Sequence, residues 1–153
     1  MLGTIHIVFA ITALVVGAGM FLQKKGDRRH RYFGYLYCIA LLALNLSALS
    51  VYRDSEGPGP FHILAFISLA TLAAGILPRL LRKPMHAWVS HHAHFMSWSY
   101  VGLVAAGIGQ MATKFSTLPA VIAVGVPSII VVLVGGLLIH TRVSVAVASY
   151  KSK

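Results

Sequence analysis

The chain has 153 residues, of which 58% are hydrophobic and only 10% are charged, and its formal net charge is +10. Soluble domains usually contain about 25% charged residues, and a water-soluble fold could not bury this much apolar surface. The basic residues lie in short runs between apolar stretches, which argues against nucleic acid as a partner. The composition predicts an integral membrane protein whose main partner is the lipid bilayer.

Five apolar segments follow one another, each near the roughly 20 residues that cross a hydrocarbon core. They are Gly3–Leu22, Tyr32–Tyr52, Phe61–Leu81, Trp88–Thr113 and Leu118–Ile139. The first lacks a preceding basic stretch, so we expect a retained helix rather than a cleaved signal. Asp54 to Pro60 is the clearest break, Pro84 suits the first turn of the fourth helix, and Pro127 predicts a kink in the fifth. The pattern predicts an all-α bundle of about five transmembrane helices, in one domain over residues 1–153.

The distribution of positive charge predicts the orientation of these helices. With the N-terminus outside, only Arg53 and Lys114 lie on the outer side. The inner side then carries Lys24, Lys25, Arg28, Arg29, Arg31, Arg79, Arg82, Lys83, Arg142, Lys151 and Lys153. Because Lys and Arg are enriched in cytoplasmic loops, we expect the N-terminus outside and the C-terminus inside, in a bacterial inner (plasma) membrane.

Histidine is the chemically distinctive residue of the sequence. The three acids all lie in loops, so no carboxylate stands within a span. His6 and His62 lie at the outer ends of the first and third helices. His30 lies at the inner end of the second helix, and His91, His92 and His94 lie in the inner third of the fourth. The remaining two, His86 and His140, read as interfacial residues.

Paired histidines at equal depth on parallel helices suit a b-type haem, whose iron takes two axial imidazoles between apolar walls. We expect His6 and His62 to hold one haem, and His30 with one histidine of the fourth helix to hold another. Two haems near opposite faces would make a path for electrons across the membrane. The same imidazoles could instead bind copper or zinc, for example a zinc held by His30, His92, His140 and water. Interfacial histidines without any ligand role are the plain alternative.

Two motifs carry a family resemblance. His30-Arg31-x-x-Gly34-x-x-Tyr37 opens the second segment, and His92-x-x-x-Met96-x-x-x-Tyr100 lies in the fourth. Together with His6 they resemble the predicted-membrane-protein family called domain of unknown function 2306. The resemblance implies no reaction, but it singles out His92 over its neighbours. The bundle is also similar, more loosely, to cytochrome b561-type bundles, which place histidines on alternate helices.

Helical spacing agrees with the choice of His92. It shares a face with Met96, Ser99, Tyr100 and Leu103, whereas His91, His94 and Trp98 point elsewhere. The Tyr100 hydroxyl could orient a bound group, and Arg31 could pair with a haem propionate or serve only as a basic anchor.

The leading hypothesis is a transmembrane electron-transfer protein that binds haem b through His6, His62, His30 and His92. A quinone or a redox protein would exchange electrons with it. Alternatives are a small accessory subunit of a larger membrane complex and a protein with a histidine metal site. Whether the chain is an enzyme stays open.

Overall fold

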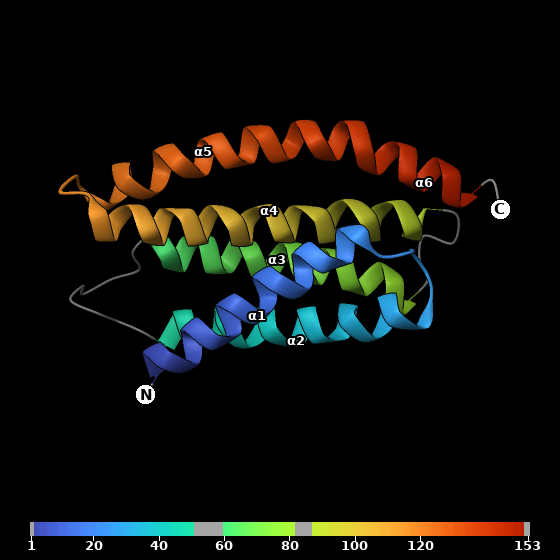
Figure 1. Cartoon of the computed structure of the whole chain (residues 1–153), viewed down its shortest axis with the longest axis horizontal. Helices are drawn as coiled ribbons and strands as arrows, with labels where there is room; N and C mark the ends of the chain where they lie inside the picture. The colour runs from blue at the N-terminus through green and yellow to red at the C-terminus, as the bar shows by residue number, and fades with distance from the viewer. Residues whose placement is uncertain (1, 51–59, 82–86, 152–153) are drawn as a thin grey trace. The chain divides into compact units, whose positions relative to one another are not determined.

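The computed structural model describes residues 2–50, 60–81 and 87–151, and all regular structure within these ranges is helical. The helices are α1 (Leu2–Leu22), α2 (Arg28–Ser50), α3 (Pro60–Leu81), α4 (Trp88–Phe115) and α5 (Ala120–Leu138), and α5 continues through a π-helical segment (Ile139–Val143) into α6 (Ser144–Lys151) (Figure 1). The predicted all-α architecture is therefore confirmed. The expected helix end at Tyr52, the break that begins at Asp54, the start at Pro84 and the position of His86 lie outside the described residues.

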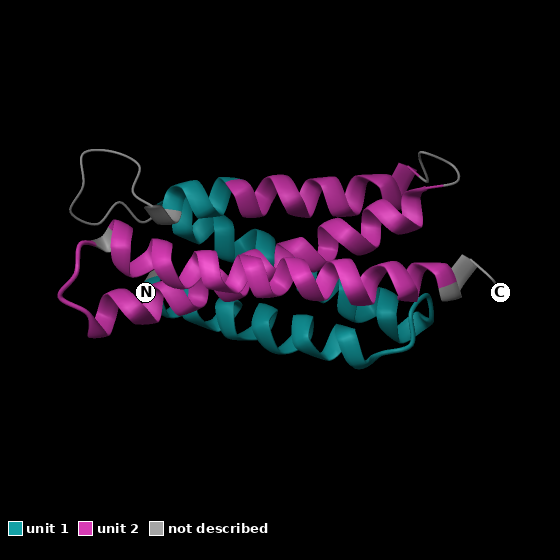
Figure 2. Ribbon diagram, turned by 90° about the horizontal axis from the view of Figure 1, so that it is seen from above, with its two compact units in different colours: residues 1–66 teal, residues 67–153 magenta. Residues whose placement is uncertain are grey.

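The chain divides into two compact units, residues 1–66 and residues 67–153 (Figure 2). The first unit contains α1, α2 and the first residues of α3. The second contains the rest of α3, α4, α5, the π-helical segment and α6. The expectation of a single domain stays a prediction.

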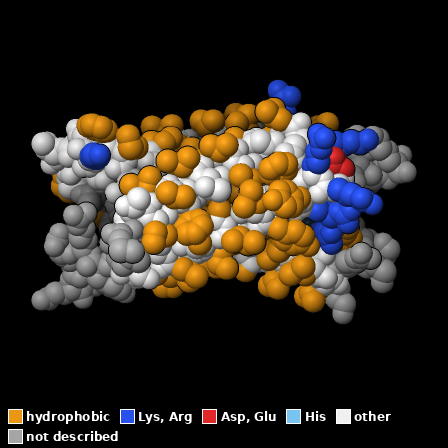
Figure 3. Space-filling model, turned by 60° about the horizontal axis from the view of Figure 1, so that its bottom comes forward, with side chains coloured by type: hydrophobic (Ala, Val, Ile, Leu, Met, Phe, Trp, Pro, Cys, Tyr) orange, Lys and Arg blue, Asp and Glu red, His pale blue; other side chains and the backbone are white. Residues whose placement is uncertain are grey.

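Four stretches of helix are long and apolar enough to cross a membrane, namely Gly3–Leu22, Arg28–Ser50, His62–Leu81 and Val121–Ala148. Large apolar side chains are exposed along them, and hydrophobic side chains cover much of the face seen in Figure 3. The fourth predicted span is present as α4 but is not one of these four. Its first half carries His91, His92 and Ser97 among other polar residues, which lower its mean hydropathy. Length and composition thus support four of the five predicted spans.

Within the first unit, a tight turn joins α1 to α2. Gly26 has a φ of 86°, which a residue without Cβ adopts readily. The backbone N–H of His30 then donates to Oδ1 of Asp27 at 2.6 Å, an N-terminal cap. Because of this cap, α2 begins at Arg28, four residues before the apolar segment that starts at Tyr32. The basic residues that follow the turn therefore belong to the first turn of the helix.

Within the second unit, α4 and α5 run side by side (Figure 1) and approach closely at glycines. A Cβ on Gly135 would lie 2.5 Å from Cγ2 of Val101, and one on Gly136 would lie 3.1 Å from Trp98. Beyond them α5 ends at Leu138, one residue from the end of the fifth predicted span at Ile139, but the chain stays helical through the π-helical segment into α6. The π-helical segment keeps the backbone helical while Thr141 donates its hydroxyl to Leu137 O at 2.9 Å.

Candidate functional site

His92 links α4 to α3 through its imidazole ring. Its Nδ1 lies 2.8 Å from the carbonyl oxygen of Gly75. A carbonyl can only accept a hydrogen bond, so Nδ1 carries the proton and, in the neutral ring, Nε2 keeps a lone pair. The half-buried side chain is thus held by two helices in the tautomer that can coordinate a metal through Nε2.

Gly75 makes this approach possible. A Cβ at this position would lie 2.8 Å from Sδ and 3.2 Å from the backbone nitrogen of Met96. Pro78, three residues further along α3, cannot donate to the carbonyl of Ala74, which loosens the backbone ladder in the same turn. The glycine therefore brings the two backbones together at the place where His92 reaches across.

A cationic and an aromatic side chain complete the polar end of this α3–α4 contact. The Cζ atom of Arg79 lies 5.5 Å from the ring centroid of Trp88, a cation–π distance. Arg79 lies one helical turn after Gly75 on α3, and Trp88 lies one turn before His92 on α4, so this pair adjoins the Gly75–His92 contact. From the sequence alone, neither residue is predicted to belong to a site. Arg79 counts there only among the inner positive charges, and Trp88 is only the start of an apolar segment. Their positions on either side of one short loop could have indicated that they lie close together.

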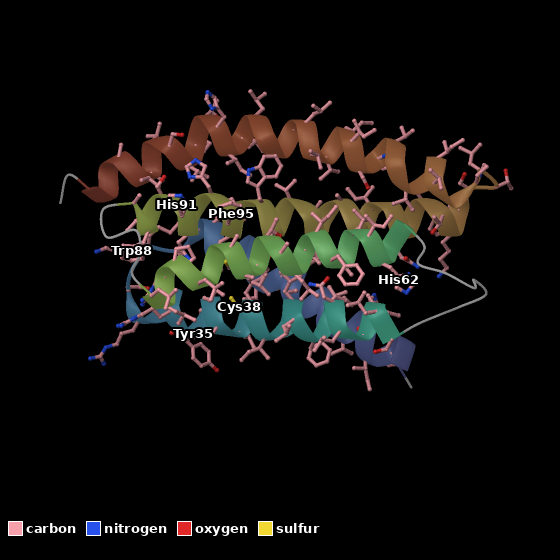
Figure 4. The ribbon with its side chains drawn as sticks, turned by 180° about the vertical axis from the view of Figure 1, so that it is seen from behind. Tyr35, Cys38, His62, Trp88, His91 and Phe95 are labelled. Atoms are coloured by element: carbon pink, nitrogen blue, oxygen red, sulfur yellow. The ribbon has the colours of Figure 1, made fainter. Side chains whose placement is uncertain are left out.

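His91 and His94 are held differently. Nδ1 of His91 bonds to O of Ala87, the N-cap residue of α4, at 3.0 Å, and Nδ1 of His94 bonds to Ser90 O at 2.8 Å within α4. Figure 4 labels the exposed His91 on α4 together with Trp88 and Phe95. These local bonds lay each ring along its own helix, whereas His92 depends on a second helix.

Two faces of α4 contact different helices in the second unit. His92 and Met96 face Gly75 of α3, and Trp98 faces Gly136 of α5. Ser99 and Leu103, predicted to share the His92 face, are buried, and Tyr100 is half-buried.

His6 has a similar arrangement in the first unit. Its Nδ1 lies 2.8 Å from Oγ of Ser47 on α2, and the Ser47 hydroxyl donates to Leu44 O at 2.7 Å. Since a hydroxyl has a single proton, the network assigns Ser47 as the acceptor and His6 Nδ1 as the donor, which again leaves Nε2 with a lone pair. His62, buried near the start of α3 (Figure 4), belongs to the same unit. One unit thus holds both residues of the predicted outer pair.

The remaining predicted site residues are divided between the two units. His30 is half-buried in the first turn of α2 and Arg31 beside it is exposed, and both belong to the first unit. His92 and Tyr100 belong to the second, so the pairing of His30 with His92 stays a prediction. His140 is exposed in the π-helical segment.

Metal binding by three or more side chains finds no support in the structure. Within the described ranges, no group of three or more His, Cys, Asp or Glu side chains is placed to hold a metal ion. This gives no support to the alternative zinc centre that uses His30, His92 and His140. Axial ligation of a haem needs only two imidazoles and does not depend on such a group.

Comparison with known proteins gives one match. A family model described as "Predicted membrane protein (DUF2306)" matches residues 3–150, nearly the whole chain, and confirms the resemblance drawn from the two histidine motifs. No curated protein and no solved structure matches the chain. The looser likeness to cytochrome b561-type bundles therefore finds no support.

Proposed function

We propose that this chain, which belongs to the DUF2306 family of predicted membrane proteins, is a transmembrane electron-transfer protein that binds haem b through histidine. The observation that carries the proposal is the hydrogen bond from His92 Nδ1 to Gly75 O. Histidines that ligate a metal almost always donate their other ring N–H to a carbonyl, a carboxylate or water, which sets the tautomer and ring orientation. His92 has this arrangement.

The neighbouring residues fit a haem as well. Arg79 lies one turn after Gly75, the partner of His92, at the end of α3 and offers a guanidinium for a propionate, as Arg31 does at the start of α2. The Tyr100 hydroxyl, two turns along α4, would help to orient the bound group. When bound, haem supplies one-electron redox chemistry, and the role of these residues is to hold the iron, balance charge and exclude water.

A second site in the first unit follows the same logic. Ser47 holds His6 with Nε2 available, and His62 offers a buried imidazole in the same unit. We assign His6 and His62 as the ligand pair of this site. The second pair would be completed by His30, and a quinone or a redox protein would supply or remove the electrons.

The proposal includes five membrane crossings, which are the four long apolar stretches and α4, and it places the N-terminus outside. An odd number of crossings places the two ends of the chain on opposite sides. The α1–α2 turn and the C-terminal end then share the side rich in Lys and Arg, which is the cytoplasmic side of a bacterial inner membrane.

An absorption spectrum of the purified protein tests the proposal. The full chain is expressed with a haem supply, purified in detergent and measured as isolated and after reduction. We expect a Soret band that shifts on reduction, together with α and β bands typical of two imidazole ligands. A colourless protein that takes up no added haem would contradict the proposal. Zinc or copper in that protein would then favour the metal-site alternative, and its absence would favour an accessory subunit.

A further inference from the structure

One exposed face of α2 changes character along its length. At helical spacing it carries Arg28, Tyr32, Tyr35, Ile39, Leu42 and Leu46. The exposed fractions of the last five are 68%, 50%, 63%, 44% and 54% in that order, and Arg28 is also exposed. Figure 4 shows Tyr35 projecting outward from the helix. The face therefore runs from a cation through two phenols to aliphatic side chains.

The cationic end of this face is reinforced by the turn before it. Lys24, Arg28 and Arg29 are all exposed within six residues. Figure 3 shows basic side chains gathered beside an acidic one, next to exposed hydrophobic side chains. The acid of this segment, Asp27, caps the backbone of His30, and Lys25 bonds to Met20 O and lies over the Phe21 ring. The exposed Lys24, Arg28 and Arg29 flank this cap and are positioned to contact a ligand.

We propose that this face binds an anionic phospholipid, with Lys24, Arg28 and Arg29 at the phosphate, the two tyrosines at the glycerol level and Ile39 and Leu42 along an acyl chain. The dimensions agree with one leaflet. From Arg28 to Leu42 the helix rises about 21 Å at roughly 1.5 Å per residue. Half of a bilayer with its headgroups measures about 20–22 Å.

The combination of charge and apolar surface favours a lipid over an acidic protein. A soluble acidic partner would match the cations but would leave the tyrosines and the aliphatic side chains below them without a contact. A phospholipid matches all three zones with one molecule. Positive charge near a span also sets orientation in general, but orientation alone does not require aromatic and aliphatic residues on the same face as the cations.

Binding to the full chain in detergent tests the inference. Dioleoyl-phosphatidylglycerol and dioleoyl-phosphatidylcholine are titrated separately, and bound lipid is counted by native mass spectrometry. A basic residue at an anionic surface contributes about fivefold in affinity. We expect the anionic lipid to bind at least about tenfold more tightly than the zwitterionic one. The triple variant Lys24→Gln, Arg28→Gln, Arg29→Gln should lose this preference.

Two matched variants separate lipid binding from other effects. Lys24→Arg, Arg28→Lys, Arg29→Lys keeps every charge and should keep the preference, and Arg142→Gln, which removes an exposed charge in the π-helical segment, should keep it too. Equal binding of the two lipids, an unchanged preference in the glutamine variant, or an equal loss in Arg142→Gln would overturn the inference. So would displacement of the lipid by inorganic phosphate or by poly-glutamate at equal concentration. None of these outcomes depends on whether haem is bound.

Discussion

The Nδ1 nitrogen of His92 on α4 lies 2.8 Å from the carbonyl oxygen of Gly75 on α3. His91 and His94, on either side of it in the sequence, bond to residues four positions earlier, Ala87 at the N-cap of α4 and Ser90 within α4. These three histidines lie within four residues but are held differently. Of the three, His92 is the one whose orientation depends on a second helix.

The first prediction concerns this inequality. We expect His92→Ala to lose bound haem, because it removes a ligand nitrogen that two helices hold in place. The loss should exceed the roughly 10- to 100-fold reduction typical of removing a group that only orients a ligand. His91→Ala and His94→Ala are the matched controls and should retain the haem content and spectrum of the unmodified protein. A silent His92→Ala beside a damaging His94→Ala would show that the wrong face of α4 was chosen.

Gly75→Ala should weaken the α3–α4 contact. The added Cβ would meet Sδ and the backbone nitrogen of Met96, and the backbone cannot yield as a flexible side chain can. Overpacking of this kind costs about 1–3 kcal/mol, and the separation would also lengthen the bond to His92. Thermal unfolding in detergent and the reduced spectrum measure both effects. Gly107→Ala, where a Cβ meets nothing within 4 Å, is the control, and an equal loss in both variants would contradict the prediction.

Ser47→Ala should affect the proposed site in the first unit through His6. The variant removes the acceptor of the Nδ1 proton, so the ring loses its fixed orientation. We expect roughly 10- to 100-fold weaker haem binding at this site and a shifted reduction midpoint, with recovery in Ser47→Thr. Ser50→Ala is the control, since this exposed hydroxyl bonds only to Leu46 O, on its own helix. Unchanged binding and midpoint in Ser47→Ala would remove Ser47 from the site.

Gly135→Ala should destabilise the packing of α4 on α5. Its Cβ would lie 2.5 Å and 2.7 Å from the two γ-carbons of Val101, so one of the helices must move. We expect a lower unfolding temperature, by an amount equivalent to about 1–3 kcal/mol. Gly125→Ala, on the same helix with nothing within 4 Å of its Cβ, should be neutral or slightly stabilising because alanine is the better helix former. A Gly135→Ala protein as stable as Gly125→Ala would mean that this contact is not made.

The proposed orientation is tested by cysteine labelling of whole cells in a Cys38→Ala background. Thr117→Cys lies in the exposed α4–α5 connection and should react with an impermeant maleimide from outside. Lys24→Cys, in the α1–α2 turn, should react only after permeabilisation. The reverse pattern would place the N-terminus inside.

The sequence by itself determined the class of the fold, because the length and spacing of apolar segments leave few choices to a chain in a bilayer. It also located the five helices and the histidines on them. The helix α2 begins four residues before the apolar segment Tyr32–Tyr52, because Asp27 caps the helix ahead of its arginines. The fifth predicted span ends at Ile139, next to the end of α5 at Leu138, but no signal in the sequence indicated that the chain stays helical through a π-helical segment into α6.

Only the tertiary structure decided how the histidines are held. Which ring nitrogen carries a proton depends on the acceptor that faces it, and Gly75 O and Ser47 Oγ come from other helices, 17 and 41 residues away in the sequence. The proximity of Arg79 to Trp88 likewise arises because α3 and α4 pack against each other. Helical periodicity assigns residues to faces, but the choice of neighbour for each face is made by packing between helices, at glycines whose missing side chains allow close approach.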